Sequence, residues 1–486
     1  MTGQADATGL QRDASARMAV GGLRAAWRRH APRLGAVACL LCCVFAVLDA
    51  LFRGTGFDRL SVAFLVLYIL VQPLNVLRSQ WAMALLLIVA GLVLAAFHHG
   101  VLAALWEGGR GTLMFILLFA SVTQLQYPAL RSPSMQVVRA MVTNLPAGWR
   151  YFWLSLASHF LSAITNFAGF ALLASFVESS TAGNLRRRMA LALSRGFVAA
   201  SSWSPFFLAM AVVVSLMPSL RWLDVAVPGL VISLCFILWG SLCDRLDARA
   251  GDGEGARSAE KIEGRGVAML RLALLSAILV GGVAAFDAVA HISMSATIAI
   301  VVTVFSLGWY ALLAASRSPA VPTVSAGEYR RNLVDSVAGL RGLSVLFIGA
   351  NIFGQGVGAA IDGQMLVDAA SHIGIAGTLW IPFLMAIMAI GSLFGLHAVI
   401  LIVVIGHTLP AATIGLAPAT LALVMLTSWG VGGVLSPLSN LTLYVANMLG
   451  ISSWRMAWRD NGFYGFGCLV IASLVIMAFQ SLTGGA

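Results

Sequence analysis

The chain has 486 residues, of which 60% are hydrophobic and only 10% are charged. This balance excludes a water-soluble domain of the same length, because such a composition would not stay in solution. The net charge of +11 comes from arginines between apolar segments, where they orient insertion into a membrane. We therefore expect membrane lipid, and no nucleic acid, as the partner of nearly the whole chain.

The N-terminal segment, residues 1–33, carries six arginines before an apolar run from Leu34 to Phe52. This pattern resembles a signal peptide, but no small-residue cleavage site follows it, so we expect a retained transmembrane helix over 34–52. The positive-inside rule places residues 1–33 in the cytoplasm. We therefore expect a multi-pass protein of a bacterial inner (cytoplasmic) membrane, with its N-terminus inside.

The next stretches alternate between long apolar runs and short basic loops. The expected crossings before the basic loop at Arg131 are 36–52, 59–76, 81–97 and 112–127. A simple crossing over 151–177 would then place the arginines 186–188 outside, against the positive-inside rule. We therefore predict a re-entrant hairpin over 151–177, whose small and polar tip at 162–169 faces a site.

The same rules predict the elements up to the C-terminus. These are a crossing over 189–217, a helix over 223–243, a cytoplasmic loop over 244–266, helices over 267–290 and 292–315, an amphipathic surface helix over 327–341, a crossing over 343–361, a hairpin over 377–414, a crossing over 418–446 and a last helix over 463–482. The second hairpin breaks at 391–397. The segment with Asp362 and Asp368 has no basic residue, which is typical of an outer loop.

These elements form two halves that are predicted to contain the same number of crossings and hairpins. Residues 59–243 and 267–482 each hold about five crossings and one re-entrant hairpin, but the first half starts outside and the second starts inside. The predicted fold is an all-α polytopic membrane protein of two inverted repeats with one extra N-terminal helix, or about eleven crossings in total.

Two prolines interrupt the crossing that follows each hairpin. Asn166 lies 39 residues before Pro205, and His397 lies 40 residues before Pro437. A proline frees backbone groups, and these groups are available to bind a ligand at membrane depth. A kink satisfied by neighbouring helices is the structural alternative for either proline alone. The residues predicted to bind substrate or ion are Thr165, Asn166, Ser202, Ser204, Pro205, His397, Ser436, Pro437, Ser439 and Asn440.

A hairpin with a small polar tip, followed about 40 residues later by a crossing broken at Ser-Pro, resembles the ion transporter superfamily. That group includes divalent-anion/sodium symporters, arsenite-permease-like carriers, gluconate and citrate carriers, and the large membrane subunit of tripartite (TRAP) transporters. The resemblance covers about residues 59–482 and implies that each tip and break bind an ion together. It implies a sodium ion near Asn166 and Ser204, whereas the second tip, Gly395-Leu396-His397, departs from the family's Ser-Asn-Thr.

Five ionisable side chains lie in or near apolar segments: His159, His397, His407, Arg195 and Asp287. A charge at membrane depth is costly, so such residues are first considered as candidates for a functional role. We expect Arg195 and Asp287 to reach the interface from their helix ends. His159 is expected to be structural. His397, at the second tip, could carry a coupling proton, and a packed neutral imidazole is the alternative.

The leading hypothesis is a secondary active transporter of a small, anionic solute, coupled to Na⁺ or H⁺, with alternating access around a midplane site. One alternative is a membrane subunit that depends on a periplasmic binding protein. Another is a membrane enzyme or assembly factor acting on lipid-linked substrates, but the sequence shows no nucleotide-binding loop, zinc-spaced motif or nucleophile elbow. We expect no enzyme, no metal site of His and Cys ligands, no cofactor beyond the coupling ion, and a homodimer.

Overall fold

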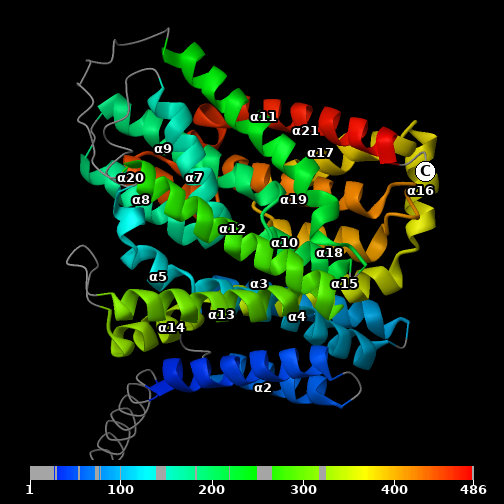
Figure 1. The fold of residues 1–486 in the computed structure, drawn as a ribbon. Helices are drawn as coiled ribbons and strands as arrows, with labels where there is room; N and C mark the ends of the chain where they lie inside the picture. The colour runs from blue at the N-terminus through cyan, green and yellow to red at the C-terminus, as the bar shows by residue number, and fades with distance from the viewer. Residues whose placement is uncertain are drawn as a thin grey trace, which may run out of the picture.

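The computed structural model describes residues 30–52, 55–71, 78–98, 100–137, 149–180, 183–217, 219–248, 265–316 and 324–483, together with Trp27 and Val76. All regular secondary structure in these ranges is helical, as predicted (Figure 1). The predicted N-terminal segment up to residue 26, and residues 249–264 of the predicted cytoplasmic loop, lie outside the described residues.

The first half begins with a helix over His30–Leu51. The elements that follow are α2 (Phe57–Val71), α3 (Arg78–Ala96), α4 (Val101–Thr123), α5 (Gln126–Arg131), α7 (Arg150–Thr165), α8 (Phe167–Ser180), α9 (Gly183–Ala199), the 3-10 helix η2 (Ala200–Ser202), α10 (Leu208–Leu216) and α11 (Trp222–Ala248). The helix α4 starts earlier than the predicted 112, because Glu107 and Arg110 lie one turn apart and form an ion pair of 3.6 Å on the helix.

The second half is also helical in the described residues. Its elements are α12 (Arg265–Ala290), α13 (Met294–Ala315), α14 (Ala326–Gly339), α15 (Arg341–Ala360), α16 (Gly363–His372), η3 (Gly377–Leu379), α17 (Trp380–Leu393), α18 (Ala398–Thr408), α19 (Pro418–Leu435), α20 (Asn440–Leu449), the π-helix η4 (Arg455–Asp460) and α21 (Gly462–Thr483). The predicted outer loop contains the short helix α16, which Asp362 caps by accepting a hydrogen bond of 2.9 Å from the Gln364 backbone N–H.

In the described part of the chain, eight helices are long and apolar enough to span a membrane, or up to nine if the bent pair α16 and α17 is one span. These eight overlap eight of the predicted crossings. The other predicted crossings fall on α2, on α3 and on the interrupted pair α9 and α10, which are shorter. The structure thus establishes an all-helical chain with several apolar spans, and the total of about eleven crossings stays a prediction.

The helices α3, α4 and α15 pack unusually closely. A Cβ atom on Gly91 of α3 would lie 2.6 Å from the Ile352 carbonyl oxygen of α15, and one on Gly349 of α15 would lie 2.9 Å from the Ala84 carbonyl oxygen of α3. A Cβ on Gly108 of α4 would lie 2.6 Å from Ile352 Cγ1. Small residues that allow backbones to approach are a common basis of helix association in lipid. These three helices therefore form one closely packed layer, which lies above α2 in the view of Figure 1.

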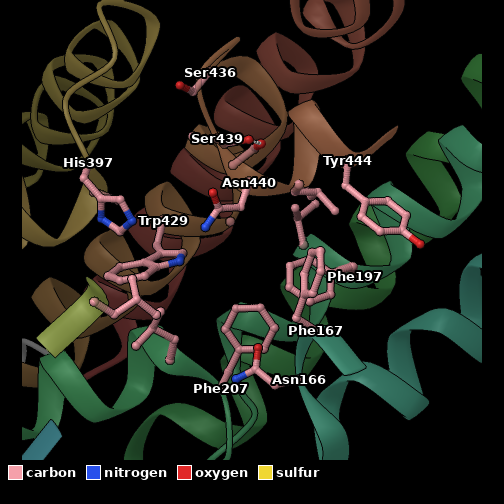
Figure 2. Close-up of a pocket in the computed structure, with 18 of the residues that line it drawn as sticks. Asn166, Phe167, Phe197, Phe207, His397, Trp429, Ser436, Ser439, Asn440 and Tyr444 are labelled. Carbon is pink, nitrogen blue, oxygen red and sulfur yellow. Dashed lines mark hydrogen bonds between the residues drawn. The ribbon is translucent and has the colours of Figure 1, made fainter. Parts of the chain in front are cut away.

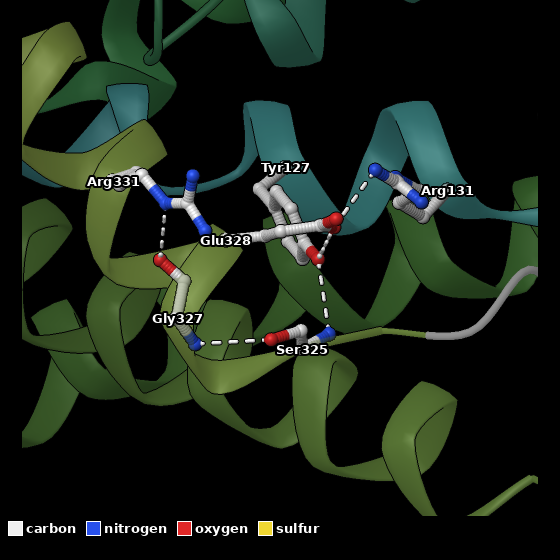
Figure 3. Close-up of polar contacts among 6 residues, drawn as sticks. All are labelled: Tyr127, Arg131, Ser325, Gly327, Glu328 and Arg331. Atoms are coloured by element: carbon white, nitrogen blue, oxygen red, sulfur yellow. Dashed lines mark hydrogen bonds and ion pairs between the residues drawn. The ribbon is translucent and has the colours of Figure 1, made fainter.

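The helix α14 is bonded to α5 at its start and to α2 at its end. At its start, Glu328 Oε2 accepts hydrogen bonds from Arg131 Nη2 at 2.9 Å and from the Tyr127 hydroxyl at 3.1 Å (Figure 3). At its end, the Tyr68 hydroxyl of α2 donates to the Val337 carbonyl at 2.8 Å. The predicted amphipathic surface helix therefore exists, but it buries Val337 and Ala338 and is anchored by these contacts.

The α7–α8 pair begins and ends at one end of the molecule. Trp149, just before α7, lies under the Arg245 guanidinium, whose carbon is 5.4 Å from the ring centre. Arg188, near the start of α9, forms a two-point ion pair with Asp244 at 2.8 and 2.9 Å. Since residues 244 and 245 are neighbours, the chain enters and leaves this pair on the same side. This is the geometry that a re-entrant hairpin requires.

Arg195 does not reach the interface, contrary to the expectation for its helix end. It is only 3% exposed, and its guanidinium donates to Asn461 Oδ1 at 3.0 Å, the Tyr151 hydroxyl at 3.1 Å and the Asp460 carbonyl at 2.7 Å. Its carbon also lies 4.6 Å from the Tyr464 ring centre. The expectation was wrong because partners on α7, η4 and α21, which are distant in the sequence, surround this position in space.

Candidate functional site

Two helical hairpins carry the tips that the sequence predicts. In the first, α7 and α8 meet at Asn166, which adopts a left-handed φ of 57°. In the second, α17 and α18 are joined by residues 394–397, where Gly395 has a φ of 84°. Both tips therefore contain a residue with positive φ, a conformation that glycine adopts freely and most other residues adopt only at a cost.

Each hairpin is followed by an interrupted helix. The first interruption separates η2 from α10 and contains Pro205, and the second separates α19 from α20 and contains Pro437. The two interrupted helices contact one another, because the Ser201 hydroxyl donates to the Leu426 carbonyl of α19 at 3.1 Å. Gly430 makes this approach possible, since a Cβ there would overlap Ser201 Oγ and lie 2.6 Å from the Val198 carbonyl oxygen.

The first tip is hydrogen-bonded to its interruption. The Ser204 hydroxyl donates to the Ala163 carbonyl at 2.5 Å and accepts from the Phe206 backbone N–H at 3.2 Å. The Asn166 side-chain amide donates to the Phe206 carbonyl at 3.3 Å. Backbone groups freed by Pro205 are therefore satisfied by the tip, so tip and interruption form one unit.

The second tip is joined to its interruption by packing instead. A Cβ on Gly395 would lie 2.5 Å from Leu438 Cδ1, so the tip lies directly against that side chain. The hydroxyls of Ser439 and Thr442 both donate to the Gly433 carbonyl, at 2.5 and 3.0 Å. These bonds join α19 to α20 across the interruption.

A cavity of about 740 Å³ lies where the tips and interruptions meet (Figure 2). Of the predicted site residues, Asn166, His397, Ser436, Ser439 and Asn440 line it. The other five, which do not line this cavity, are Thr165, Ser202, Ser204, Pro205 and Pro437. All of these five are buried, and they shape the hairpin and the interruptions behind the cavity wall.

Several aromatic side chains line the cavity, and the sequence analysis did not predict them. Phe167, Phe197, Phe207, Trp429 and Tyr444 come from five different helices or turns and line the cavity together (Figure 2). The Phe167 ring lies edge-on to Phe197 and Tyr444, with centres 5.9 and 5.7 Å apart. Phe167 follows the first tip directly, and Phe207 lies two residues after Pro205. Their position next to a predicted break could therefore have identified these two residues from the sequence.

Four helices begin at this cavity. The first residues of α8, α10, α18 and α20 are Phe167, Leu208, Ala398 and Asn440, and all four line it. The N-terminal end of a helix carries partial positive charge and unpaired N–H groups, so it favours anions. Two of these ends are capped by side chains, since His397 accepts from Val399 N–H at 3.3 Å and Ser439 accepts from Thr442 N–H at 3.0 Å.

The lining residues include no Asp, Glu, Lys or Arg. Among the residues that the structure describes, no group of three or more His, Cys, Asp and Glu side chains is arranged to hold a metal ion. The cavity is therefore an uncharged chamber in which helix ends and neutral polar side chains supply the electrostatic field.

The histidines take different positions. His397 lies at the cavity, with its ring edge-on to Trp429 and the ring centres 5.7 Å apart. His159 is fully buried in α7 and accepts a hydrogen bond of 3.2 Å from Trp203 Nε1. It does not line the cavity, and its contacts are those of a packing residue.

Two solved structures of membrane transporters share this fold. The YdaH transporter of Alcanivorax borkumensis is 14% identical, with a TM-score of 0.56, and the match covers 82% of this chain and 97% of that chain. MtrF of Neisseria gonorrhoeae, described as illuminating a class of antimetabolite efflux pumps, is 13% identical, with a TM-score of 0.56, and the match covers 84% of this chain and 96% of that one. No protein-family model and no curated protein sequence matches the chain. At these identities the likeness shows the fold alone.

Proposed function

We propose that the chain is a secondary active transporter of a small, anionic solute, coupled to Na⁺ or H⁺. The observation that carries this proposal is the convergence of four helix N-termini and two hairpin tips on one uncharged cavity. Helix N-termini can hold an anion without a buried counter-charge, which would be costly at membrane depth. The two inverted repeats, each with a re-entrant hairpin, are part of the proposal.

The mechanism that we propose is alternating access. The closely packed layer of α3, α4 and α15 forms one side of the cavity, where Phe119 and Val122 of α4 line it, and the hairpins with the interrupted helices form the other. Movement of the hairpin side against this layer would expose the cavity to each membrane face in turn. The second tip, beside Leu438, is the element that we expect to move.

A cation has candidate oxygen ligands near the first interruption. Ser202 Oγ is fully buried and has no hydrogen-bond partner, in contrast to Ser204 Oγ, which is already used twice. Sodium prefers such hydroxyl and carbonyl oxygens, and a buried hydroxyl without a partner is costly by about 1–3 kcal/mol. The sodium ion that the family resemblance places near Asn166 and Ser204 would therefore use Ser202 in addition.

Transport by the purified chain in proteoliposomes tests this proposal. The assay measures counterflow of radiolabelled benzenesulfonate, succinate, citrate and sulfate, with protein-free liposomes as the control. We expect at least one anion to exchange without any Na⁺ or H⁺ gradient. The same anion should accumulate when a Na⁺ or H⁺ gradient is imposed. If none of the four exchanges, the proposal of an anion carrier is wrong. If exchange requires an added periplasmic protein, the binding-protein-dependent alternative replaces it.

A further inference from the structure

His397 occupies a position that couples its side chain to the second hairpin. Its Nδ1 atom accepts the Val399 backbone N–H at 3.3 Å, so this imidazole is the N-cap of α18. An Nδ1 atom that accepts a hydrogen bond carries no proton, so the proton of the neutral ring is on Nε2. Adding a proton at Nδ1 therefore requires the loss of the cap of α18.

Among the described residues that line the cavity, His397 alone can change its charge near neutral pH. Tyr444 is the other titratable residue of the lining, and a phenol titrates near pH 10. The hairpin packs against α10, α15, α19 and α21, of which α10 and α19 carry no titratable side chain. The titratable groups on α15, α18 and α21 are Arg341, His407, Tyr464 and Cys468, and none of them lines the cavity.

The opposite walls add no charge to the lining. The charged residues on α4, α8, α9 and α14 are Glu107, Arg110, Glu178, Arg186, Arg187, Arg188, Arg195, Glu328, Arg330, Arg331 and Asp335, and none of them lines the cavity. An imidazolium at residue 397 would thus stand at the N-terminus of α18 without a counter-charge. The positive end of a helix disfavours a cation, so only an anion in the cavity would balance it.

We propose that His397 carries the coupling proton and binds it together with the anionic solute. This inference rests on the proposed transport function and specifies its coupling ion. A proton from the aqueous side adds to Nδ1 of the neutral imidazole and gives an imidazolium, which releases the Val399 N–H and pairs with the anion. On the opposite side the anion leaves, Nδ1 returns its proton to water, and the cap of α18 forms again. Proton and anion move in the same direction, because each favours the binding of the other.

The first test needs no transport. Protonated imidazole quenches a neighbouring indole, so the Trp429 emission reports the charge of His397. We expect Trp429→Phe to remove one part of the pH titration of tryptophan emission, and we expect that part to lie at higher pH with benzenesulfonate than without it, because the anion stabilises the imidazolium. His397→Asn should also remove it, because asparagine caps a helix well but takes up no proton. His407→Asn, on the same helix but away from the cavity, should leave it unchanged.

The second test follows protons during transport. Proteoliposomes containing a pH-sensitive dye receive an inward gradient of each of the four anions, and acidification of the interior is measured beside counterflow. We expect the anion that exchanges to acidify the interior, and His397→Asn to lose that acidification while retaining some counterflow. A His397→Asn protein that still acidifies the interior, or interior alkalinisation by the parent, would overturn the proposal.

The two tests separate this inference from the proposed function. Absence of counterflow for every anion counts against the transporter, whereas the fluorescence titration still decides whether His397 takes up a proton. The inference is contradicted, even if transport is observed, if Trp429→Phe removes no part of the titration in either condition, or if the part that depends on Trp429 persists in His397→Asn.

Discussion

The side-chain amide of Asn166 donates a hydrogen bond of 3.3 Å to the carbonyl of Phe206, 40 residues further along the chain. This bond joins the tip of the first hairpin to the turn that interrupts the following helix. Asn166 also has a φ of 57°, which most residues adopt only at a cost. One residue therefore supplies both the shape of the tip and its attachment.

Substitution of Asn166 by glycine and by alanine separates these two roles. Asn166→Gly keeps the left-handed backbone accessible and removes only the amide, whereas Asn166→Ala adds strain of about 1–2 kcal/mol. We expect both variants to weaken solute binding, and Asn166→Ala to have the lower melting temperature in detergent. Equal melting temperatures would mean that the positive φ stores no strain.

Asn440 should contribute to solute binding without supporting the fold. It is exposed, begins α20 and points into the cavity (Figure 2). Loss of one hydrogen-bonding group to a bound solute costs about 1–3 kcal/mol, or roughly five- to 150-fold in affinity. We expect Asn440→Ala to raise the half-saturation constant of counterflow by a factor in this range, with unchanged expression and melting temperature.

Two controls are matched to that change. Asn447→Ala makes the same substitution on the same helix at an exposed position outside the cavity, and Asp368→Ala removes an exposed side chain of α16. Both should transport as the parent does. If Asn440→Ala and Asn447→Ala are indistinguishable, the solute does not contact the start of α20.

Gly430 and Gly433 form a matched pair on α19. A Cβ on Gly430 would overlap Ser201 Oγ and the Val198 carbonyl, whereas one on Gly433 would lie 3.7 Å from Val198 Cγ1, an ordinary contact. Forcing apart two packed helices costs about 1–3 kcal/mol. We expect Gly430→Ala to lower the melting temperature and to reduce transport, and Gly433→Ala to be tolerated. If Gly433→Ala is instead the more damaging of the two substitutions, the two interrupted helices do not approach one another at Gly430 as closely as the structure shows.

Arg195 should be required for stability rather than for solute binding. Its removal would leave Asn461 Oδ1, the Tyr151 hydroxyl and the Asp460 carbonyl without their donor, at about 1–3 kcal/mol for each buried group. We expect Arg195→Met to lower the melting temperature strongly, and Arg195→Lys to restore little of it, because an ammonium lacks the planar fork that reaches three acceptors. Arg245→Met, at an exposed arginine, is the control. A stable Arg195→Met protein with altered affinity would instead assign this residue to the transport path.

The orientation of the chain can be measured with single cysteines at Asp247 and Asp368. Both side chains are exposed, Asp247 at the end of α11 and Asp368 on α16, and these two elements lie toward opposite ends of the molecule (Figure 1). The positive-inside rule places Asp247 in the cytoplasm. An impermeant thiol reagent should therefore label the cysteine at 368 in intact spheroplasts and the cysteine at 247 only after permeabilisation. Labelling in the opposite order would invert the topology.

Much of the architecture could be predicted from local sequence. Apolar length and the placement of arginines predicted the helices, and the sequence predicted a reversal near Asn166 and interruptions at Pro205 and Pro437, positions at which helices of the described chain end or begin. These features are local, because helix length is set by the thickness of the bilayer, and a proline breaks a helix wherever it stands. The membrane topology built on them, with two inverted repeats, remains a prediction.

The composition of the cavity was decided by tertiary structure. Five of the ten predicted site residues line it and five lie behind its wall, while Phe197, Trp429 and Tyr444 enter it from helices with no distinguishing motif. The same holds for Arg195, whose acceptors come from residues 151, 460 and 461. The sequence determined where the helices break, because that depends on neighbouring residues. Packing between distant segments, such as Ser201 against Leu426, determines which side of each break faces the cavity. These segments are hundreds of residues apart in the sequence, so only the folded chain defines that packing.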